Sequence, residues 1–255
     1  MLRWVILFLA VVLPAQSALS EEVVAGLSQN RIAITANFDG SEILIFGAVK
    51  RDAPPPAGAG PLQVVITVSG PLEPITVRRK EKKWGIWVNT DAVEVDAAPS
   101  FYAIAASGAF TDVVTDTEDL RHHISIPRAI RSVGAPMTIQ DAASFTDALI
   151  RIRKDKDLYQ LLESTVEITD ETLFRTSIAL PANLTEGDYT TRFFLTRDGA
   201  VIDTYETVIF VNKVGLERLL YSLAHERPLI YGLLSLAIAI AAGWLASAVF
   251  RYIRA

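Results

Sequence analysis

Apolar and polar residues alternate with different periods along this chain, and its carboxyl end is apolar throughout. Residues 229–250 contain no charged side chain. At a rise of 1.5 Å per residue, a helix of that length spans about 33 Å, close to the ~30 Å hydrocarbon core of a bilayer. The pattern therefore predicts a single C-terminal transmembrane helix over residues 229–250, and Pro228 suits its first turn.

The amino end carries a shorter apolar run, residues 4–13, between Arg3 and a group of small residues that includes Ala15 and Ser17. This run is too short to span a bilayer comfortably, and small residues two positions apart suit a signal peptidase. We interpret residues 1–20 as a signal peptide. The alternative is an uncleaved signal anchor, which would leave the domain on the same side of the membrane but add a second helix.

The two ends together predict the topology. An export signal delivers the middle of the chain across the membrane, and Arg251 and Arg254 lie just beyond the apolar helix. Positive charge next to a membrane span is retained on the cytoplasmic side. We therefore expect the domain on the far side of the membrane and residues 251–255 as a cytoplasmic tail.

Short apolar segments broken by turn residues predict a first β module over residues 21–108. Asp39-Gly40 predicts a hairpin turn into the next strand. That strand, residues 43–49, is apolar at both parities, which favours a central strand buried on both faces. Further strands are expected near residues 62–68, 75–77, 84–89 and 101–107. The spacing of about seven strands is typical of an immunoglobulin-like β-sandwich.

The period changes to that of a helix in residues 109–164, which we interpret as a helical connecting segment. Phe145 and Tyr159 share one face of a helix expected over residues 141–163. The mostly charged run at residues 151–157 predicts a solvated turn of this helix or a break in it.

Strand signals return in residues 165–212, a second β module in which Asp198-Gly199 predicts a hairpin turn. Tyr189, just before a strand, is similar to the tyrosine corner of immunoglobulin-like sandwiches. Strand spacing alone leaves open whether this block completes the first sandwich or closes its own, and we favour two packed modules. The expected fold is mainly β, with one or two immunoglobulin-like β-sandwich modules and an intervening helical segment.

Leucines at helical spacing predict a short amphipathic helix beside the membrane, over residues 215–227. Within the transmembrane helix, small residues recur every four positions, at Ser235, Ala239, Gly243 and Ser247. Such a row lets two helix backbones approach closely. We predict that it packs against a second copy of the chain or an integral-membrane partner.

Composition limits the kinds of function that remain. Removing Arg3, Arg251 and Arg254 from the 24 cationic residues leaves 21 against 29 acidic ones, so residues 21–228 carry a formal charge of −8. Such an acidic domain is a poor nucleic-acid binder, and we expect no nucleic-acid partner. The chain has no cysteine, which excludes disulfides, thiolate metal sites and cysteine nucleophiles.

Histidines and carboxylates meet at one place, where His122 and His123 follow Asp116, Glu118 and Asp119. Adjacent side chains diverge on a helix or a strand and chelate one ion poorly. We interpret these residues as a polar helix end and expect no metal or other cofactor. The chain has no nucleophile elbow, His-Glu-x-x-His, Walker or dinucleotide motif, so we expect no enzyme activity.

Basic residues gather in one segment of this acidic domain: Arg78, Arg79, Lys80, Lys82 and Lys83. At a hairpin tip they would contact an anion, anionic lipid head groups or an acidic partner, and each cation near such a surface contributes about 1 kcal/mol. The alternative is a solvated turn that keeps strand edges from aggregating. The neighbouring Trp84 and Trp87 differ in parity, so the core needs at most one of them.

Five segments also resemble a family of transmembrane proteins described from alphaproteobacteria. They are RIAITANFDGSEILIFGAVK (31–50), KEKKWGIWVN (80–89), PSFYAIAAS (99–107), LFRTSIALPANLTEGDYTTRFFLTRDG (173–199) and YGLLSLAIAIAAGWLASAVF (231–250). The resemblance runs in the same order over nearly the whole chain. It implies a single-pass protein of the bacterial inner membrane, with its domain in the periplasm and its C-terminus in the cytoplasm, and it brings no assigned activity.

These observations favour a non-enzymatic accessory or binding subunit, held in the bilayer by one helix and assembling with a membrane partner such as a transporter. A periplasmic sensor or capture module for a small anion or an envelope component is the alternative. A membrane-tethered hydrolase is a third class, and its distinguishing sign would be a deep pocket where Asp, Glu or His side chains converge.

Overall fold

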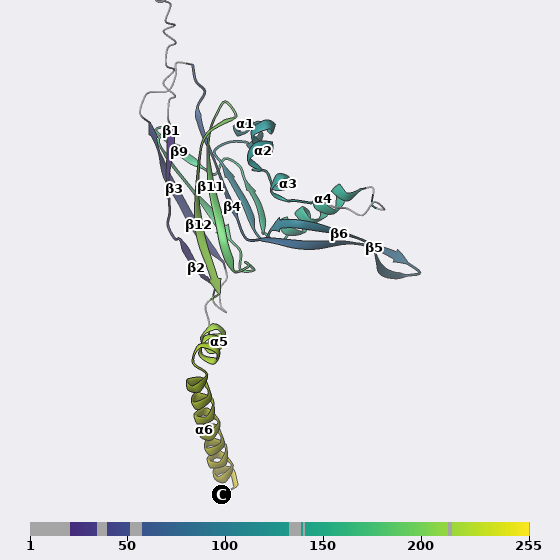
Figure 1. Cartoon of the computed structure of the whole chain (residues 1–255), viewed down its shortest axis with the longest axis vertical. Coiled ribbons are helices and arrows are strands. Elements are labelled where there is room, and N and C mark those ends of the chain that lie inside the picture. Colours follow the sequence, from purple (N-terminus) through teal and green to yellow (C-terminus); the bar gives the residue numbers. More distant parts are fainter. Residues whose placement is uncertain are drawn as a thin grey trace, which may run out of the picture.

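A computed structural model describes residues 21–34, 40–51, 58–132, 139, 141–213 and 216–254. Strands make up most of the domain, and one long apolar helix follows it at the carboxyl end (Figure 1). The prediction of a mainly β fold with a single C-terminal transmembrane helix is confirmed. The predicted signal peptide, residues 1–20, lies outside the described residues.

Two sheets form the body of the domain. The first has the strand order β1-β3-β10-β9 (Glu21–Leu27, Ser41–Arg51, Leu173–Leu180 and Glu167–Thr169). The second has the order β2-β12-β11-β4-β7-β8 (Arg31–Ile34, Ala200–Lys213, Gly187–Arg197, Leu62–Ser69, Tyr102–Ala106 and Tyr159–Leu162). The remaining strands, β5 (Leu72–Lys83) and β6 (Ile86–Pro99), form a separate two-stranded hairpin.

The two sheets pack face to face around one apolar core. Residues of β10 are alternately exposed and buried, and the buried ring of Phe174 lies 6.0 Å from the ring of Phe193 on β11. Strands of the two predicted blocks are mixed, because β10 pairs with β3 and β11 pairs with β4. The preference for two packed modules is therefore wrong. Alternation identifies the buried face of a strand but not its neighbour in the sheet.

The hairpin predicted at Asp39-Gly40 is also wrong. Strand β2 pairs in parallel with β12, whereas β3 pairs with β1 and β10, so the chain crosses from one sheet to the other. Gly40 has φ +115°, which glycine adopts readily. Strand β3 is not buried on both faces, because Leu44 and Phe46 are 46% and 47% exposed on the outer face of the first sheet.

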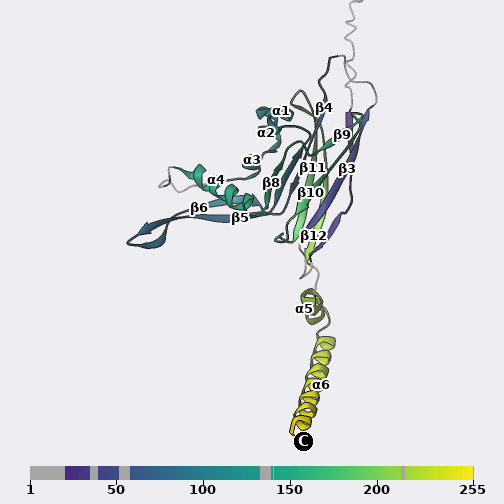
Figure 2. The ribbon, with the colours of Figure 1, turned by 180° about the vertical axis from the view of Figure 1, so that it is seen from behind.

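Short helices cover the outer face of the second sheet: α1 (Phe110–Val113), α2 (Asp116–His122) and α3 (Ile126–Ala129). They lie beside β4 and β7 in both views (Figures 1 and 2). The Tyr102 hydroxyl on β7 donates a hydrogen bond of 2.8 Å to the Ile124 carbonyl between α2 and α3. As a result Val65 and Thr67 on β4 are buried although they face away from the sandwich core.

The predicted helix over residues 141–163 is shorter in the structure. Helix α4 (Ala142–Lys154) ends within the charged run, which confirms the break predicted there. Residues Tyr159–Leu162 form strand β8, parallel to β7, and not a continuation of the helix. The Tyr159 hydroxyl donates to the Pro99 carbonyl at 2.8 Å, a tertiary contact that helical periodicity does not predict.

The β5–β6 hairpin leaves the sandwich sideways, and α4 lies beside its base (Figures 1 and 2). At the carboxyl end, α5 (Leu216–Glu226) matches the predicted juxtamembrane helix. Helix α6 (Pro228–Arg254) begins at Pro228, as predicted, and its segment Pro228–Ser247 is long and apolar enough to cross a membrane. The chain therefore places a folded β domain next to one membrane helix.

Candidate functional site

The most unusual surface is the end of the β5–β6 hairpin, residues 80–89, here called the hairpin tip. Trp84 and Gly85 form its turn, with φ values of 54° and 85°. Two positive φ values are typical of a tight hairpin turn that normally selects Asn-Gly. A bulky residue in this region is strained, by about 1–3 kcal/mol. The Trp84 side chain is also 102% exposed, so no packing within the chain explains it.

Other apolar and cationic side chains surround Trp84. Trp87 and Ile86 are 68% and 64% exposed. Lys82 is paired across the strands with Trp87, and Lys83 with Ile86, so each aromatic or aliphatic residue has a cation beside it. Both tryptophans are outside the core, whereas the sequence required this of only one.

The five basic residues of this segment differ in exposure and in their contacts. Arg78, Lys80, Lys82 and Lys83 are exposed. Arg79 instead donates hydrogen bonds to Asp141 Oδ2 at 2.6 Å and Ser144 Oγ at 2.7 Å, and its guanidinium lies 4.6 Å from the ring centre of Phe145. The hydrogen bond from Arg79 lowers the pKa of Asp141. Arg79 therefore fixes the hairpin to α4 and does not belong to the exposed basic surface.

The histidine and carboxylate cluster forms a polar helix end. His122 Nε2 lies 3.4 Å from Glu118 Oε2 one turn earlier, and Asp119 Oδ1 accepts hydrogen bonds from the backbone of Ile124 and Ser125. Arg192 on β11 donates to the carbonyls of His122 and His123, at 2.8 and 3.1 Å. Within the described ranges, no three His, Asp or Glu residues are arranged to hold a metal ion.

A small cavity of about 200 Å³ lies beside this cluster and is lined by His122, Arg192, Phe194 and Glu206, among others. The His122 ring packs edge-on against Phe194, with ring centres 5.7 Å apart. Arg192 already binds two backbone carbonyls here, so it holds α2 on the sheet. The contacts of Arg192 and His122 at this cavity are therefore contacts that stabilise the fold.

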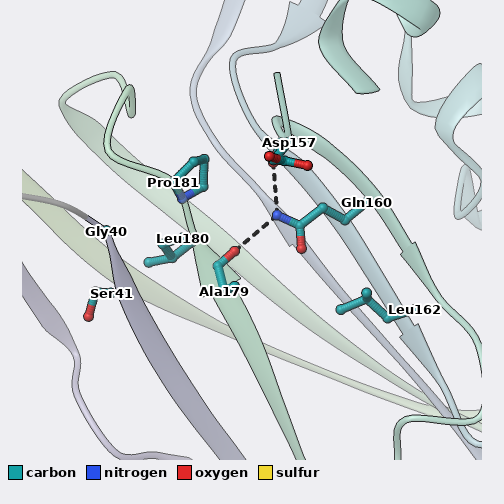
Figure 3. Close-up of a pocket in the computed structure, with 8 residues that line it drawn as sticks. All are labelled: Gly40, Ser41, Asp157, Gln160, Leu162, Ala179, Leu180 and Pro181. Carbon is teal, nitrogen blue, oxygen red and sulfur yellow. Dashed lines mark hydrogen bonds between the residues drawn. The ribbon is translucent and has the colours of Figure 1, made fainter. Parts of the chain in front are cut away.

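A larger cavity of about 570 Å³ opens at the edge of the sandwich, between β8 and β10 (Figure 3). Gln160 lies in it and donates hydrogen bonds to the carbonyls of Asp157 and Ala179, at 2.8 and 3.0 Å. Its amide therefore links the two sheets where no strand pairing joins them in the described chain. The rest of the lining is largely apolar, and it brings together few side chains that could carry out a reaction.

The small-residue row of α6 stays a prediction. Ser235, Ala239, Gly243 and Ser247 are all exposed in the single chain, and a Cβ added at Gly243 would meet no atom within 4 Å. The helix face is therefore sterically open to another helix.

The structure shows two features that were not predicted from the sequence. An ion cluster joins Glu21 of β1 to Arg51 of β3 and Arg197 of β11. The second is the Trp84-Gly85 turn, for which the sequence contains a signal: Gly85 lies between two long segments that form strands β5 and β6. The similarity of Tyr189 to a tyrosine corner agrees with one contact of the structure: its hydroxyl donates a hydrogen bond of 2.8 Å to the Thr185 carbonyl, four residues upstream.

Comparison with known protein families shows which family the chain matches. The model of a family described as "Putative transmembrane protein (Alph_Pro_TM)" matches residues 22–252. The match begins at the second residue of β1 and ends two residues before the end of α6, so it covers nearly all of the β domain and the membrane helix. No curated protein matches the chain.

Proposed function

Because this chain belongs to the Alph_Pro_TM family of transmembrane proteins, we propose that it is a non-enzymatic accessory subunit whose β domain binds an integral-membrane partner. Helix α6 holds the domain in the bacterial inner membrane. The apolar amino end and the two arginines in the last turn of α6, Arg251 and Arg254, support a periplasmic domain and a cytoplasmic C-terminus. A transporter is a suitable partner, since it offers both a membrane helix and a periplasmic surface.

The hairpin tip is the observation that carries this proposal. A fully exposed tryptophan in a strained turn destabilises the fold, and its side chain makes no packing contact that would offset this strain. Tryptophan is among the side chains that supply most of the binding energy at protein interfaces. We infer that the tip inserts Trp84 and Trp87 into a pocket on a partner whose surface is acidic.

The direction of the hairpin favours a protein partner over lipid. Strand β5 has 12 residues, which makes the hairpin about 40 Å long. It extends sideways from the sandwich, across the direction of α6 and not along it (Figure 1). The hairpin can therefore contact a membrane protein beside the anchored domain, whereas the lipid bilayer lies in the direction of α6. The exposed cations Lys80, Lys82 and Lys83 then contact acidic side chains of the same partner protein.

Crosslinking in intact membranes tests the proposal. The full-length chain and a Trp84→Ala/Trp87→Ala variant are crosslinked and purified, and captured membrane proteins are compared. The matched control is Leu44→Ala/Leu173→Ala, which removes apolar side chains of 46% and 56% exposure from the outer face of the first sheet.

We expect one membrane protein to be captured by the wild type and the control but not by the tip variant. Equal capture by the tip variant would refute the role of the tip. Capture of no membrane protein by the wild type would refute the accessory function itself.

A further inference from the structure

A third cavity lies at the base of the hairpin, between β5 and α4. Its volume is about 380 Å³, within the range of small-molecule sites, roughly 300–1,000 Å³. Four consecutive residues of β5, 75–78, line it. Since side chains alternate between the faces of a strand, four in a row place the cavity along the strand edge. That edge carries no other strand in the described chain, because β5 pairs with β6 alone.

The cavity walls combine apolar side chains with cations. Ile75 of β5 and Leu149 and Ile152 of α4 form apolar parts of the wall. Ile152 is 45% exposed, so it offers apolar surface that a ligand would remove from water. Arg78, Arg153 and Lys156 also line the cavity, and no Asp or Glu does.

This charge distribution stands out against the rest of the domain. Residues 21–228 carry a formal charge of −8, yet three cations line one small cavity. Arg153 Nη1 donates to the Ser100 carbonyl at 3.1 Å, which holds its guanidinium at the cavity wall. A guanidinium has five N–H donors, so this bond leaves the capacity for a two-point contact with an anion.

We propose that this cavity binds a single-chain anionic amphiphile. The alkyl chain lies between the edge of β5 and α4, against Ile75, Leu149 and Ile152. The anionic head group, a carboxylate or a phosphate monoester, binds Arg78, Arg153 and Lys156. This site is separate from the hairpin tip and does not depend on the proposed membrane partner.

Thermal unfolding of the full chain in nanodiscs of zwitterionic lipid tests the site. Octanoate and octyl phosphate are the anionic amphiphiles, and the two separate the carboxylate from the phosphate head group. Octanol carries the chain without the charge, and inorganic phosphate carries the charge without the chain. The variants are Arg78→Gln and Lys156→Gln, both exposed positions of the wall, and the matched control is Lys154→Gln, an exposed lysine of α4 outside the cavity.

We expect at least one of the two anionic amphiphiles to raise the melting temperature of the wild type and of Lys154→Gln, while octanol and inorganic phosphate do not. Each cavity variant should bind that amphiphile about tenfold more weakly, the effect of losing one charge-assisted hydrogen bond.

Three results would overturn the proposal. The first is no response to either amphiphile, and the second is an equal response in the wild type and both cavity variants. The third is equal protection by inorganic phosphate, which would assign the cavity to a free anion.

Discussion

The ion cluster at the start of β1 ties the two sheets together. Arg197 Nη2 on β11 donates to both carboxylate oxygens of Glu21, at 2.9 and 3.0 Å, and Arg51 Nε on β3 donates to Glu21 Oε1 at 2.8 Å. The side chains of Glu21 and Arg197 are each 10% exposed, and that of Arg51 is 18% exposed. One carboxylate therefore contacts two largely buried cations, of which Arg51 also lies 3.7 Å from the exposed carboxylate of Glu171.

Replacing Glu21 with alanine should leave both guanidinium groups without their common carboxylate. Removing one partner of a buried ion pair costs about 3–5 kcal/mol. We expect a loss of about 3 kcal/mol, because the cluster lies at the end of the sheet and water reaches Arg51 after the change. For a domain of roughly 200 residues, each kcal/mol lowers the melting temperature by about 2–4 °C, so the expected decrease is about 6–12 °C.

The next residue supplies a matched control. Glu22 lies 3.6 Å from Lys50, and these two side chains are 60% and 61% exposed. Such a surface pair contributes about 0–1 kcal/mol, so Glu22→Ala should leave stability nearly unchanged. A Glu21→Ala variant that unfolds within about 1 kcal/mol of Glu22→Ala would refute the reasoning, since the two sites would then be equally screened.

The assay has to report on the β domain. Trp84, Trp87 and Trp244 are 102%, 68% and 69% exposed, so tryptophan fluorescence says little about the core. Far-UV circular dichroism of the full chain in a mild detergent follows the loss of strands directly. The double variant Glu21→Ala/Arg197→Met should then lose less stability than the sum of the losses in the two single variants. The reason is that the double variant no longer contains the unpaired guanidinium of Arg197.

Three further predictions concern the tip, the core and the anchor. Trp84→Asn replaces a strained residue with one that the turn prefers, so thermal unfolding should show a gain of about 1 kcal/mol while membrane crosslinking shows weaker partner capture; a variant that keeps full capture would contradict this. Burial raises the pKa of Tyr159 to about 12, from 10.0. Because the folded-state pKa is the higher one, this contribution to stability is complete below pH 10 and is lost as the pH rises towards 12. In urea titrations Tyr159→Phe should therefore lose less stability over that interval than the wild type; an equal slope would contradict the assignment. Gly243→Ile fills the open face of α6, so assembly measured by native gel in detergent should fail while membrane insertion persists; Gly232→Ile, at a glycine outside the small-residue row, is the control.

Periodicity predicted the elements of this protein better than their arrangement. The charge-free run after Pro228 specified α6 because hydrophobic length alone decides whether a helix spans a bilayer. The alternation in β10 likewise gave its buried face. Neither pattern shows which strands lie next to each other in a sheet. Pairing of β3 with β10 joins residues more than a hundred positions apart, and no local period predicts such a contact.

Two local signals were also misread because tertiary contacts outweighed them. Residues Tyr159–Leu162 continue an apolar helical face, yet they form β8 because β7 offers an edge and Pro99 an acceptor for the Tyr159 hydroxyl. The basic segment was treated as one cluster, but the structure separates Arg79 from its neighbours. Its hydrogen bond to Asp141 spans 62 positions of sequence.

This last contact explains how the hairpin is held in place. An isolated two-stranded hairpin is marginally stable in water, and β5–β6 has no third strand in the described chain. Helix α4 takes that place through Arg79, which binds Asp141 and Ser144 and lies over Phe145. The same helix forms one wall of the cationic cavity. The exposed tip and the cavity therefore depend on one support, so a change that detaches α4 should disable both, whereas changes at Trp84 or Lys156 should disable only one.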